Sequence, residues 1–276
     1  MDLEEAADGV VRVINATMVR GMRAASVAKG HDPREFTLVA FGGGGPVHAA
    51  ELARSFGAPE VLVPIAPGVT SALGLLMSDV RYDFSATYLR PLEEADAASL
   101  TRLYVDLEHQ ALEQMARDRI APQDVVLSRT AEARYRGQGF ELEVAVPSEA
   151  LDAAAIERVR TAFHALHEQH YGYTMPGEPL VLVNAQVTAL GALPKPELVK
   201  YQQDGRQQPS LKGRRPVYAG GHWTDAAVYD RIQLQPAMTI DGPAIVEQVD
   251  STTLLLPGDR GRIDPFGNLI VRVAGA

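Results

Sequence analysis

Four consecutive glycines, Gly42 to Gly45, lie between an apolar run at residues 36–41 and a helical segment. Pro46 suits the first turn of a helix, and Gly57 stands where such a helix would end. A second short apolar run follows at residues 61–64. Strand, glycine loop, helix and strand in this order predict a βαβ unit in an α/β domain, with the first strand buried on both faces.

The glycine loop is a candidate binding site for a phosphate or a nucleotide. Without side chains, the backbone at Gly42, Gly43, Gly44 and Gly45 can come close to a ligand. The first turn of the following helix has unpaired N–H groups at the positive end of the helix dipole, which favours an anion. The loop has neither the Gly-Lys-Ser/Thr ending of a P-loop nor the GxGxxG spacing of a dinucleotide fingerprint. The alternative is a tight turn whose glycines serve packing alone.

Three further side chains are candidates for the same site. His48 lies in the first turn of the helix after the glycines and could donate to a phosphate or to a substrate oxygen. Its alternative role is packing at the helix surface. Arg20 and Arg23 lie on the first predicted helix, where they could contact a nucleotide or belong to a solvated, ion-paired face.

Composition excludes several classes of protein. The 276 residues are 46% hydrophobic and 22% charged, which excludes a disordered chain. The sequence has no cysteine, so disulfides, thiolate metal sites and cysteine nucleophiles are excluded. The net charge of −9 argues against nucleic-acid binding, and no apolar run approaches the ~20 residues that span a bilayer. We therefore expect a cytoplasmic protein that binds neither nucleic acid nor membrane.

The first predicted helix, at residues 3–29, has a stripe of mostly small residues that would permit close packing on a neighbouring element. The stripe consists of Val10, Val13, Ile14, Thr17, Gly21, Ala24, Ala25 and Ala28. Further helices are predicted at residues 70–78 (capped by Thr70 or Ser71), 95–116 and 151–170. Strands are predicted at residues 80–88, 125–135, 140–146 and 180–190. Residues 194–215 indicate a surface excursion or hinge, and frequent turn signals beyond it predict a small β-rich module.

Two polar clusters have alternative explanations. His164, His167 and His170 share a predicted helix and could be metal ligands, but the third is rotated away from the other two. We expect His170 instead to be a core histidine that continues an apolar stripe. Glu247, Asp250, Ser251 and Thr252 lie at a predicted strand end, where capping of a turn is the simplest role. An interface between subunits or a catalytic role is the alternative for these four residues. No GxSxG elbow marks a serine hydrolase.

Four stretches of the chain resemble the hydantoinase A/5-oxoprolinase family, which includes the A-type component of N-methylhydantoinase, ATP-dependent 5-oxoprolinases and one component of acetone carboxylase. They are GHDPREFTLVAFGGGGPVHAAELA (30–53), VPIAPGVTSALGLLMSDVRYDF (63–84), HEQHYGYTMP (167–176) and DGPAIVEQVDSTTLLLPGDRGRIDPFGNLIV (241–271). Because the stretches are spread over nearly the whole chain, the resemblance is much more specific than a lone glycine loop.

The resemblance implies an actin-like ATPase fold with the nucleotide between two lobes. Members use ATP with Mg²⁺ to activate an amide or ketone oxygen by phosphorylation, often with a separate hydantoinase B-type subunit or domain. The family's glycine motif falls on Gly42, Gly43, Gly44 and Gly45 and is similar to the adenosine-side loop of actin-like ATPases. A second motif falls on Pro67, Gly68, Ser71, Ala72 and Gly74, with no chemical role assigned.

One departure from the family pattern is large. The glycine-threonine phosphate motif DxGGTxTD, which opens the first lobe, is not found in this chain. We therefore expect residues 1–90 to be the C-terminal part of the actin-like lobe, and residues 91–276 to be an α+β C-terminal domain with a β-rich end. The N-terminal lobe would supply the phosphate and metal contacts, and this chain alone would not complete a catalytic cycle.

The expected function is that of the C-terminal portion of an ATP-dependent cyclic amide hydrolase. Hydantoins, 5-oxoproline, other lactams and ketones all remain open as substrates. One alternative is a non-catalytic nucleotide-binding or assembly subunit of such a complex or of a ketone carboxylase. Another is an α/β module that binds a different phosphorylated metabolite through the same loop.

Overall fold

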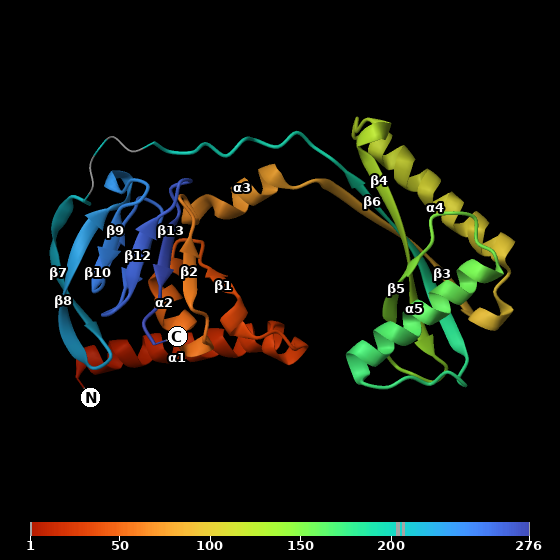
Figure 1. The fold of residues 1–276 in the computed structure, drawn as a ribbon, viewed down its shortest axis with the longest axis horizontal. Helices are drawn as coiled ribbons and strands as arrows, with labels where there is room; N and C mark the ends of the chain where they lie inside the picture. The colour runs from red at the N-terminus through yellow and green to blue at the C-terminus, as the bar shows by residue number, and fades with distance from the viewer. Residues whose placement is uncertain (1, 203–204, 206–207, 276) are drawn as a thin grey trace. The chain divides into compact units, whose positions relative to one another are not determined.

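The computed structural model describes residues 2–202, 205 and 208–275, which form two compact units. Unit 1 comprises residues 1–76 and 196–276, and unit 2 comprises residues 77–195 (Figure 1). Unit 2 is therefore an insertion in the sequence of unit 1. The division expected near residue 90 stays a prediction.

The first part of unit 1 contains the predicted βαβ unit. Its elements are α1 (Leu3–Ala25), η1 (Val27–Lys29), η2 (Pro33–Glu35), β1 (Thr37–Val39), α2 (Gly45–Phe56), β2 (Glu60–Val63), η3 (Pro67–Val69) and α3 (Thr70–Met77). β1 and β2 pair in parallel, with α2 between them in the sequence. A capping box of Asp2 and Glu5 begins α1, and Gly57 ends α2 in the left-handed conformation. The α/β fold class and this unit are thus confirmed.

The last part of the chain returns to complete the sheet of unit 1. The sheet has the order β1-β2-β13-β12-β9, in which β13 (Leu269–Arg272) lies antiparallel to β2. The other two strands are β12 (Arg260–Ile263) and β9 (Thr239–Asp241). The core joins apolar side chains from both ends of the sequence. Among its members are Ala53, Val61, Val63, Ile240, Leu255, Leu269 and Val271.

A second, four-stranded sheet in unit 1 has the order β11-β10-β8-β7. Its strands are β7 (Leu211–Ala219), β8 (His222–Asp230), β10 (Ala244–Glu247) and β11 (Thr252–Leu255). A short helix, η6 (Arg231–Gln233), follows β8, and α2 packs against β11. The predicted β-rich end is therefore confirmed, although its strands belong to the same compact unit as the βαβ segment.

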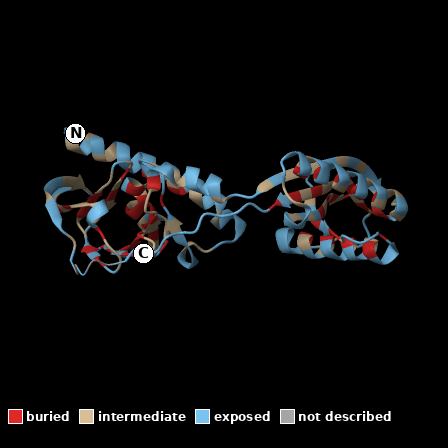
Figure 2. Ribbon diagram, turned by 90° about the horizontal axis from the view of Figure 1, so that it is seen from above, coloured by how far each residue is buried: buried red, intermediate tan, exposed pale blue. Residues whose placement is uncertain are grey.

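Unit 2 is an antiparallel sheet packed against two helices. The order β3-β6-β4-β5 is formed by β3 (Val80–Pro91), β6 (Leu180–Gly191), β4 (Val125–Tyr135) and β5 (Leu142–Val146). The helices are α4 (Ala97–Arg117) and α5 (Ala153–Tyr171), with short η4 (Leu92–Glu94) and η5 (Pro122–Asp124). Burial alternates along β4 and β6, and their buried residues share one core with buried residues of α4 and α5. Figure 2 marks the buried residues in red. None of the helices in the described part of the chain is both long and apolar enough to cross a membrane.

The expectation that the first strand is buried on both faces is wrong. β1 is an edge strand, and Phe36, Val39 and Phe41 each expose 50% of their surface. Leu38 and Ala40 pack in the core instead. Hydrophobicity alone could not show that the second face of this strand has no cover within the described chain.

The structure also corrects two helix details. The predicted helix at 3–29 ends as an α-helix at Ala25, and its last turn is the 3₁₀ segment η1. Thr70 does not cap α3, because its hydroxyl donates to the carbonyl of Ala66 at 2.9 Å and α3 continues directly from η3.

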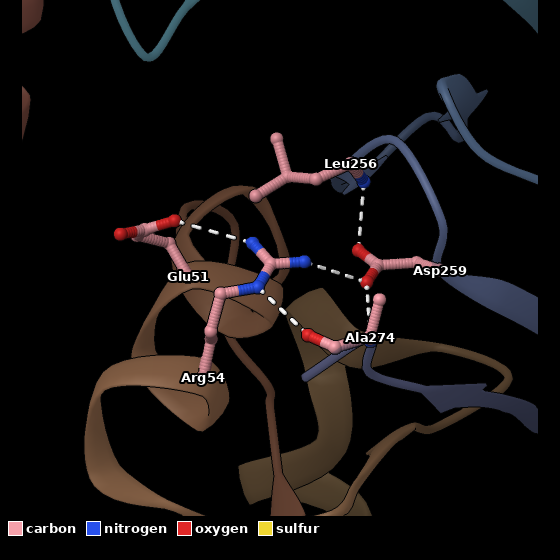
Figure 3. A network of polar contacts seen from close by, with 5 residues as sticks. All are labelled: Glu51, Arg54, Leu256, Asp259 and Ala274. Carbon is pink, nitrogen blue, oxygen red and sulfur yellow. Dashed lines mark hydrogen bonds and ion pairs between the residues drawn. The ribbon is translucent and has the colours of Figure 1, made fainter. Parts of the chain in front are cut away.

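An ion pair between a half-buried arginine and a fully buried aspartate fastens α2 to the C-terminal strands (Figure 3). The guanidinium of Arg54 donates to Asp259 at 2.8 Å and to the carbonyl of Ala274 at 3.0 Å. The Asp259 side chain has no exposed surface and also accepts from the backbone N–H groups of Leu256 and Ala274. A buried carboxylate needs such partners, so this contact ties segments 205 residues apart in the sequence.

Arg54→Met should destabilise unit 1 by about 3 kcal/mol, because it leaves the buried Asp259 without its cation. The exposed pair of Arg34 and Asp32 provides the control, and Arg34→Met should change the stability by less than about 0.5 kcal/mol. Urea unfolding followed by the fluorescence of Trp223, the single tryptophan, measures both in unit 1. Equal effects of the two variants would contradict the structural role of the buried pair.

Candidate functional site

The glycine loop lies at the carboxyl end of β1, where it turns the chain into α2. Gly42 has φ +80°, a left-handed conformation that favours glycine, and its N–H donates to the carbonyl of Pro67 at 2.7 Å. Gly44 is the N-cap of α2, and Pro46 lies in the first turn. The loop therefore requires glycine at Gly42 for its backbone conformation and joins the second sequence motif through Pro67.

The remainder of the loop presents backbone donors. Within the part of the chain that the structure describes, no group accepts a hydrogen bond from the N–H of Gly43, Gly44 or Gly45. A β-carbon at Gly44 would meet no atom within 4 Å, and one at Gly43 would lie 3.5 Å from the Asp250 carbonyl. These three donors lie at the N-terminal end of a 12-residue helix, where unpaired N–H groups favour an anion.

A turn between β10 and β11 supports the loop. The Ser251 hydroxyl donates to the carbonyls of Gly43 at 3.0 Å and Gly42 at 3.4 Å. The Gln248 side chain donates to the carbonyl of Ile65 at 2.6 Å. Ser251 is buried, so its two contacts fix the conformation of the glycine loop from the interior of unit 1.

Asp250 of the same turn contacts the second glycine motif at Gly68. Its carboxylate accepts from the N–H of Gly68 at 2.8 Å. A β-carbon at Gly68 would lie 2.6 Å from the Asp250 β-carbon, a distance too short for any side chain to occupy. Gly68 is thus required by the close approach of this turn.

The polar residues at 247–252 therefore have distinct roles. Asp250 and Ser251 bind the two glycine motifs, whereas Glu247 pairs with Lys212 at 2.7 Å and Arg215 at 2.6 Å. These two hydrogen bonds hold the pKa of Glu247 below its ordinary value. Sequence reasoning favours a local turn here, with an interface or catalytic role as the alternative, and misses the contact with the loop, because nothing local links residues 208 positions apart.

His48 lies in the first turn of α2 and contacts α1. Its Nδ1 is 2.8 Å from the side-chain oxygen of Asn15, a buried residue, so Nδ1 donates. The role of His48 toward a ligand stays a prediction. Arg20 bonds to Thr17 on its own helix, at 3.4 Å. Arg23 donates to the carbonyl of Ser55 at the far end of α2, so the structure does not bring it to the loop.

Family models cover both motif regions. Residues 1–84 match the hydantoinase/oxoprolinase model, and residues 90–271 match the hydantoinase/oxoprolinase C-terminal domain. The chain belongs to the hydantoinase/oxoprolinase family. The glycine loop lies in the first matched region and the turn at 248–251 in the second, so the candidate site joins the two.

Two relatives and one solved structure illustrate the likeness to the family. The alpha subunit of the Pseudomonas jessenii caprolactamase is 30% identical over 96% of this chain and 39% of its own. The beta subunit of the Xanthobacter autotrophicus acetone carboxylase is 30% identical over 93% of this chain and 38% of its own. The crystal structure of ATP-dependent caprolactamase from P. jessenii superposes with a TM-score of 0.80 and 28% identity, over 99% of this chain and 40% of that one. The chain thus spans about two fifths of the length of these family members.

The family stretch at residues 167–176 belongs to a buried network in unit 2. His167 is fully buried, with its Nδ1 2.7 Å from the carbonyl of Tyr173 and its Nε2 2.9 Å from the Gln138 side chain. His170 is exposed, so the expectation that it is the core histidine is wrong. The buried face of α5 is formed by Ala155, Val159, Phe163 and His167. The i, i+4 spacing from Phe163 reaches His167, and His170, three residues further along, lies outside the buried face.

Burial shifts the pKa of a second histidine in unit 2, His164. The Nδ1 of His164 lies 2.5 Å from the Tyr135 hydroxyl, and that hydroxyl accepts a hydrogen bond from the N–H of Met175. Burial lowers the pKa of His164 below its ordinary value, and the positive charge of Arg160 acts in the same direction. Across the described residues, no group of three or more His, Asp or Glu side chains could hold a metal ion.

Gly68→Ala should destabilise unit 1 by about 1–3 kcal/mol, since the added methyl group overlaps Asp250 and displaces the turn. Gly44→Ala is the control, because its β-carbon would enter open space. Urea unfolding followed by Trp223 fluorescence compares the two variants. An equal loss of stability in both would show that Asp250 does not constrain residue 68.

The stability of unit 2 should fall as the pH drops through about 6.5 toward the folded-state pKa of His164. The sign follows from the lowered folded pKa, because the unfolded chain binds the proton more readily and is favoured in acid. His164→Gln should reduce the loss between pH 7.5 and pH 5.5, and His170→Gln, at an exposed position, is the matched control. Pulse proteolysis in urea, with fragments of unit 2 identified by mass, gives the comparison. A loss of stability that is unchanged by His164→Gln would refute this assignment.

Proposed function

We propose that this chain is the C-terminal portion of an ATP-dependent hydantoinase/5-oxoprolinase-type amidohydrolase, in which the glycine loop positions the adenine nucleotide. The single observation that supports this most is the loop itself, with the N–H donors of Gly43, Gly44 and Gly45 at the start of α2. Family membership adds the reaction type, since one relative is a caprolactamase described as ATP-dependent.

The loop residues fit a nucleotide on two grounds. The absence of side chains at Gly43 and Gly44 lets a flat or bulky group approach the backbone closely. The backbone N–H groups then donate to acceptor atoms on the adenosine side of the nucleotide, while Ser251 binds the loop carbonyls. His48 would stand beside this surface with its Nδ1 committed to Asn15, which leaves Nε2 as the atom that can meet a ligand.

The side chains of this chain provide only part of an active site. When bound, ATP would supply the phosphoryl group that activates an amide oxygen of the cyclic substrate. Asp250 is the charged side chain that supports the second motif, and a carboxylate there disfavours the highly charged phosphates. We therefore assign the adenosine side of the nucleotide to this loop and the contacts to the phosphates and Mg²⁺ to the remaining region of the longer family protein.

The partners follow from the same division. About three fifths of the length of each relative lies outside the part that this chain matches, and we propose that an N-terminal lobe in that part completes the site. A hydantoinase B-type subunit or domain would act with it on a small cyclic amide. We expect hydrolysis only when all these parts are present.

One observation favours a second candidate. The beta subunit of acetone carboxylase is as similar to this chain as the caprolactamase subunit is, at 30% identity. The same loop would then serve a ketone carboxylase, or a non-catalytic nucleotide-binding or assembly subunit of such a complex. Assays of one complete assembly with a lactam and with a ketone plus bicarbonate separate the two reactions. If the assembly hydrolyses ATP with neither substrate, the result favours the assembly role.

Gly43→Asp in the complete protein should weaken ATP binding by about tenfold or more, because a carboxylate would stand among the N–H donors. The fold should be kept, since a side chain at Gly43 meets only an ordinary contact at 3.5 Å. Gly177→Asp in unit 2 is the matched control, because its β-carbon also enters open space. Isothermal titration with ATP and ADP measures both affinities, and unchanged binding in Gly43→Asp would remove the nucleotide role.

A further inference from the structure

Helix α1 has its apolar side facing solvent. Val10 exposes 65% of its surface, Val13 68% and Ile14 48%. The stripe continues along the helix through exposed Thr17, Gly21 and Ala24, the same positions that the sequence predicts to pack closely on a neighbour. In a helix at the surface of a finished domain, the apolar stripe faces the core.

The opposite side of α1, which faces the rest of unit 1, is more polar. Its buried residues are Asn15 and Val19, and Asn15 bonds to His48. Glu4 and Asp8 lie on the same side and are half-buried. The inward side therefore combines the polar contact of Asn15 with apolar packing of Val19, while the apolar stripe on the outward side stays uncovered by the described chain. Apolar surface of this extent marks a contact site.

A second exposed surface in unit 1 points to the same conclusion. β1 lies at the edge of its sheet, and its outer edge has no partner strand among the described residues. Phe36, Val39 and Phe41 are half-exposed beside it. An apolar strand with a free edge is a pairing surface unless another segment covers it.

We infer that the outward face of α1 is the contact surface for the N-terminal region of the longer family chains, supplied on the same polypeptide or as a separate chain. This rests on the two-part organisation under the proposed function, but not on nucleotide binding. The occupant follows from length, because about three fifths of each relative lies outside the part that this chain matches. Small residues at Thr17, Gly21 and Ala24 would let a helix of that region approach α1 closely.

The absence of cysteine from the sequence makes this surface directly measurable. Single substitutions Val10→Cys and Ile14→Cys place a thiol on the outward face. Ala16→Cys is the control, since it is exposed and lies about 120° around the helix from Val10. Maleimide labelling rates, resolved by peptide mass spectrometry, are compared between this chain alone and the complete protein that includes the N-terminal region.

Both test thiols should react freely in this chain and at least about tenfold more slowly in the complete protein, while Ala16→Cys stays reactive in both. Equal rates in the two forms would overturn the inference. Protection already present in this chain, and growing with its concentration, would identify a second copy as the occupant and overturn it as well. Measuring ATP binding of the complete protein and of its Gly43→Asp variant beside the labelling separates the two proposals. Absent protection with ATP binding that Gly43→Asp weakens refutes only the contact surface, and full protection with ATP binding that Gly43→Asp leaves unchanged refutes only the nucleotide role.

Discussion

Unit 1 depends on contacts between the two ends of its sequence. The carboxylate of Asp259 is fully buried, and Arg54 of α2 is the cation that neutralises it. β13, which ends two residues before Ala274 of this contact, pairs with β2, so the βαβ segment and the last strands form one sheet. A two-stranded parallel pair would be marginal by itself, and the C-terminal strands supply the surface on which α2 and β2 are buried. Unit 1 can therefore form only after residues on both sides of unit 2 have come together.

The same return of the chain shapes the glycine loop. The turn at residues 248–251 lies between β10 and β11, and its placement beside the loop follows from the packing of α2 against β11. Ser251 then binds the loop carbonyls and Asp250 binds Gly68. The family's two glycine motifs thus meet at one turn, with Gly42 explained by its left-handed backbone and Gly68 by the approach of Asp250.

Local patterns predicted most of the elements but not their partners. The strand at Val125–Tyr135 and the helix after the glycine loop follow from periodicity and from their flanking glycine and proline residues. The pairing of β13 with β2 could not be predicted, because the pairing of strands about 200 residues apart leaves no local signal. The choice of His170 over His167 shows a different limit. The two histidines are three residues apart on the same helix, and only His167 follows Phe163 at the i, i+4 spacing of the buried face, so the choice exchanges a fully buried side chain for an exposed one.

The apolar stripe on α1 is predicted to be buried but is exposed in the structure. The pattern of Val10, Val13 and Ile14 predicts burial, and the described chain provides no cover for it. A 23-residue helix gains most of its stability from tertiary packing, yet α1 packs with its more polar side through Asn15. Local and global preferences normally agree in a folded protein, and their conflict here is resolved if the helix has a second neighbour. The glycine loop points the same way, since its N–H donors are held open beside a carboxylate that cannot balance a phosphate charge. Under the two proposals, the rest of a family-length protein would supply an apolar surface for α1 and positive charge for the nucleotide.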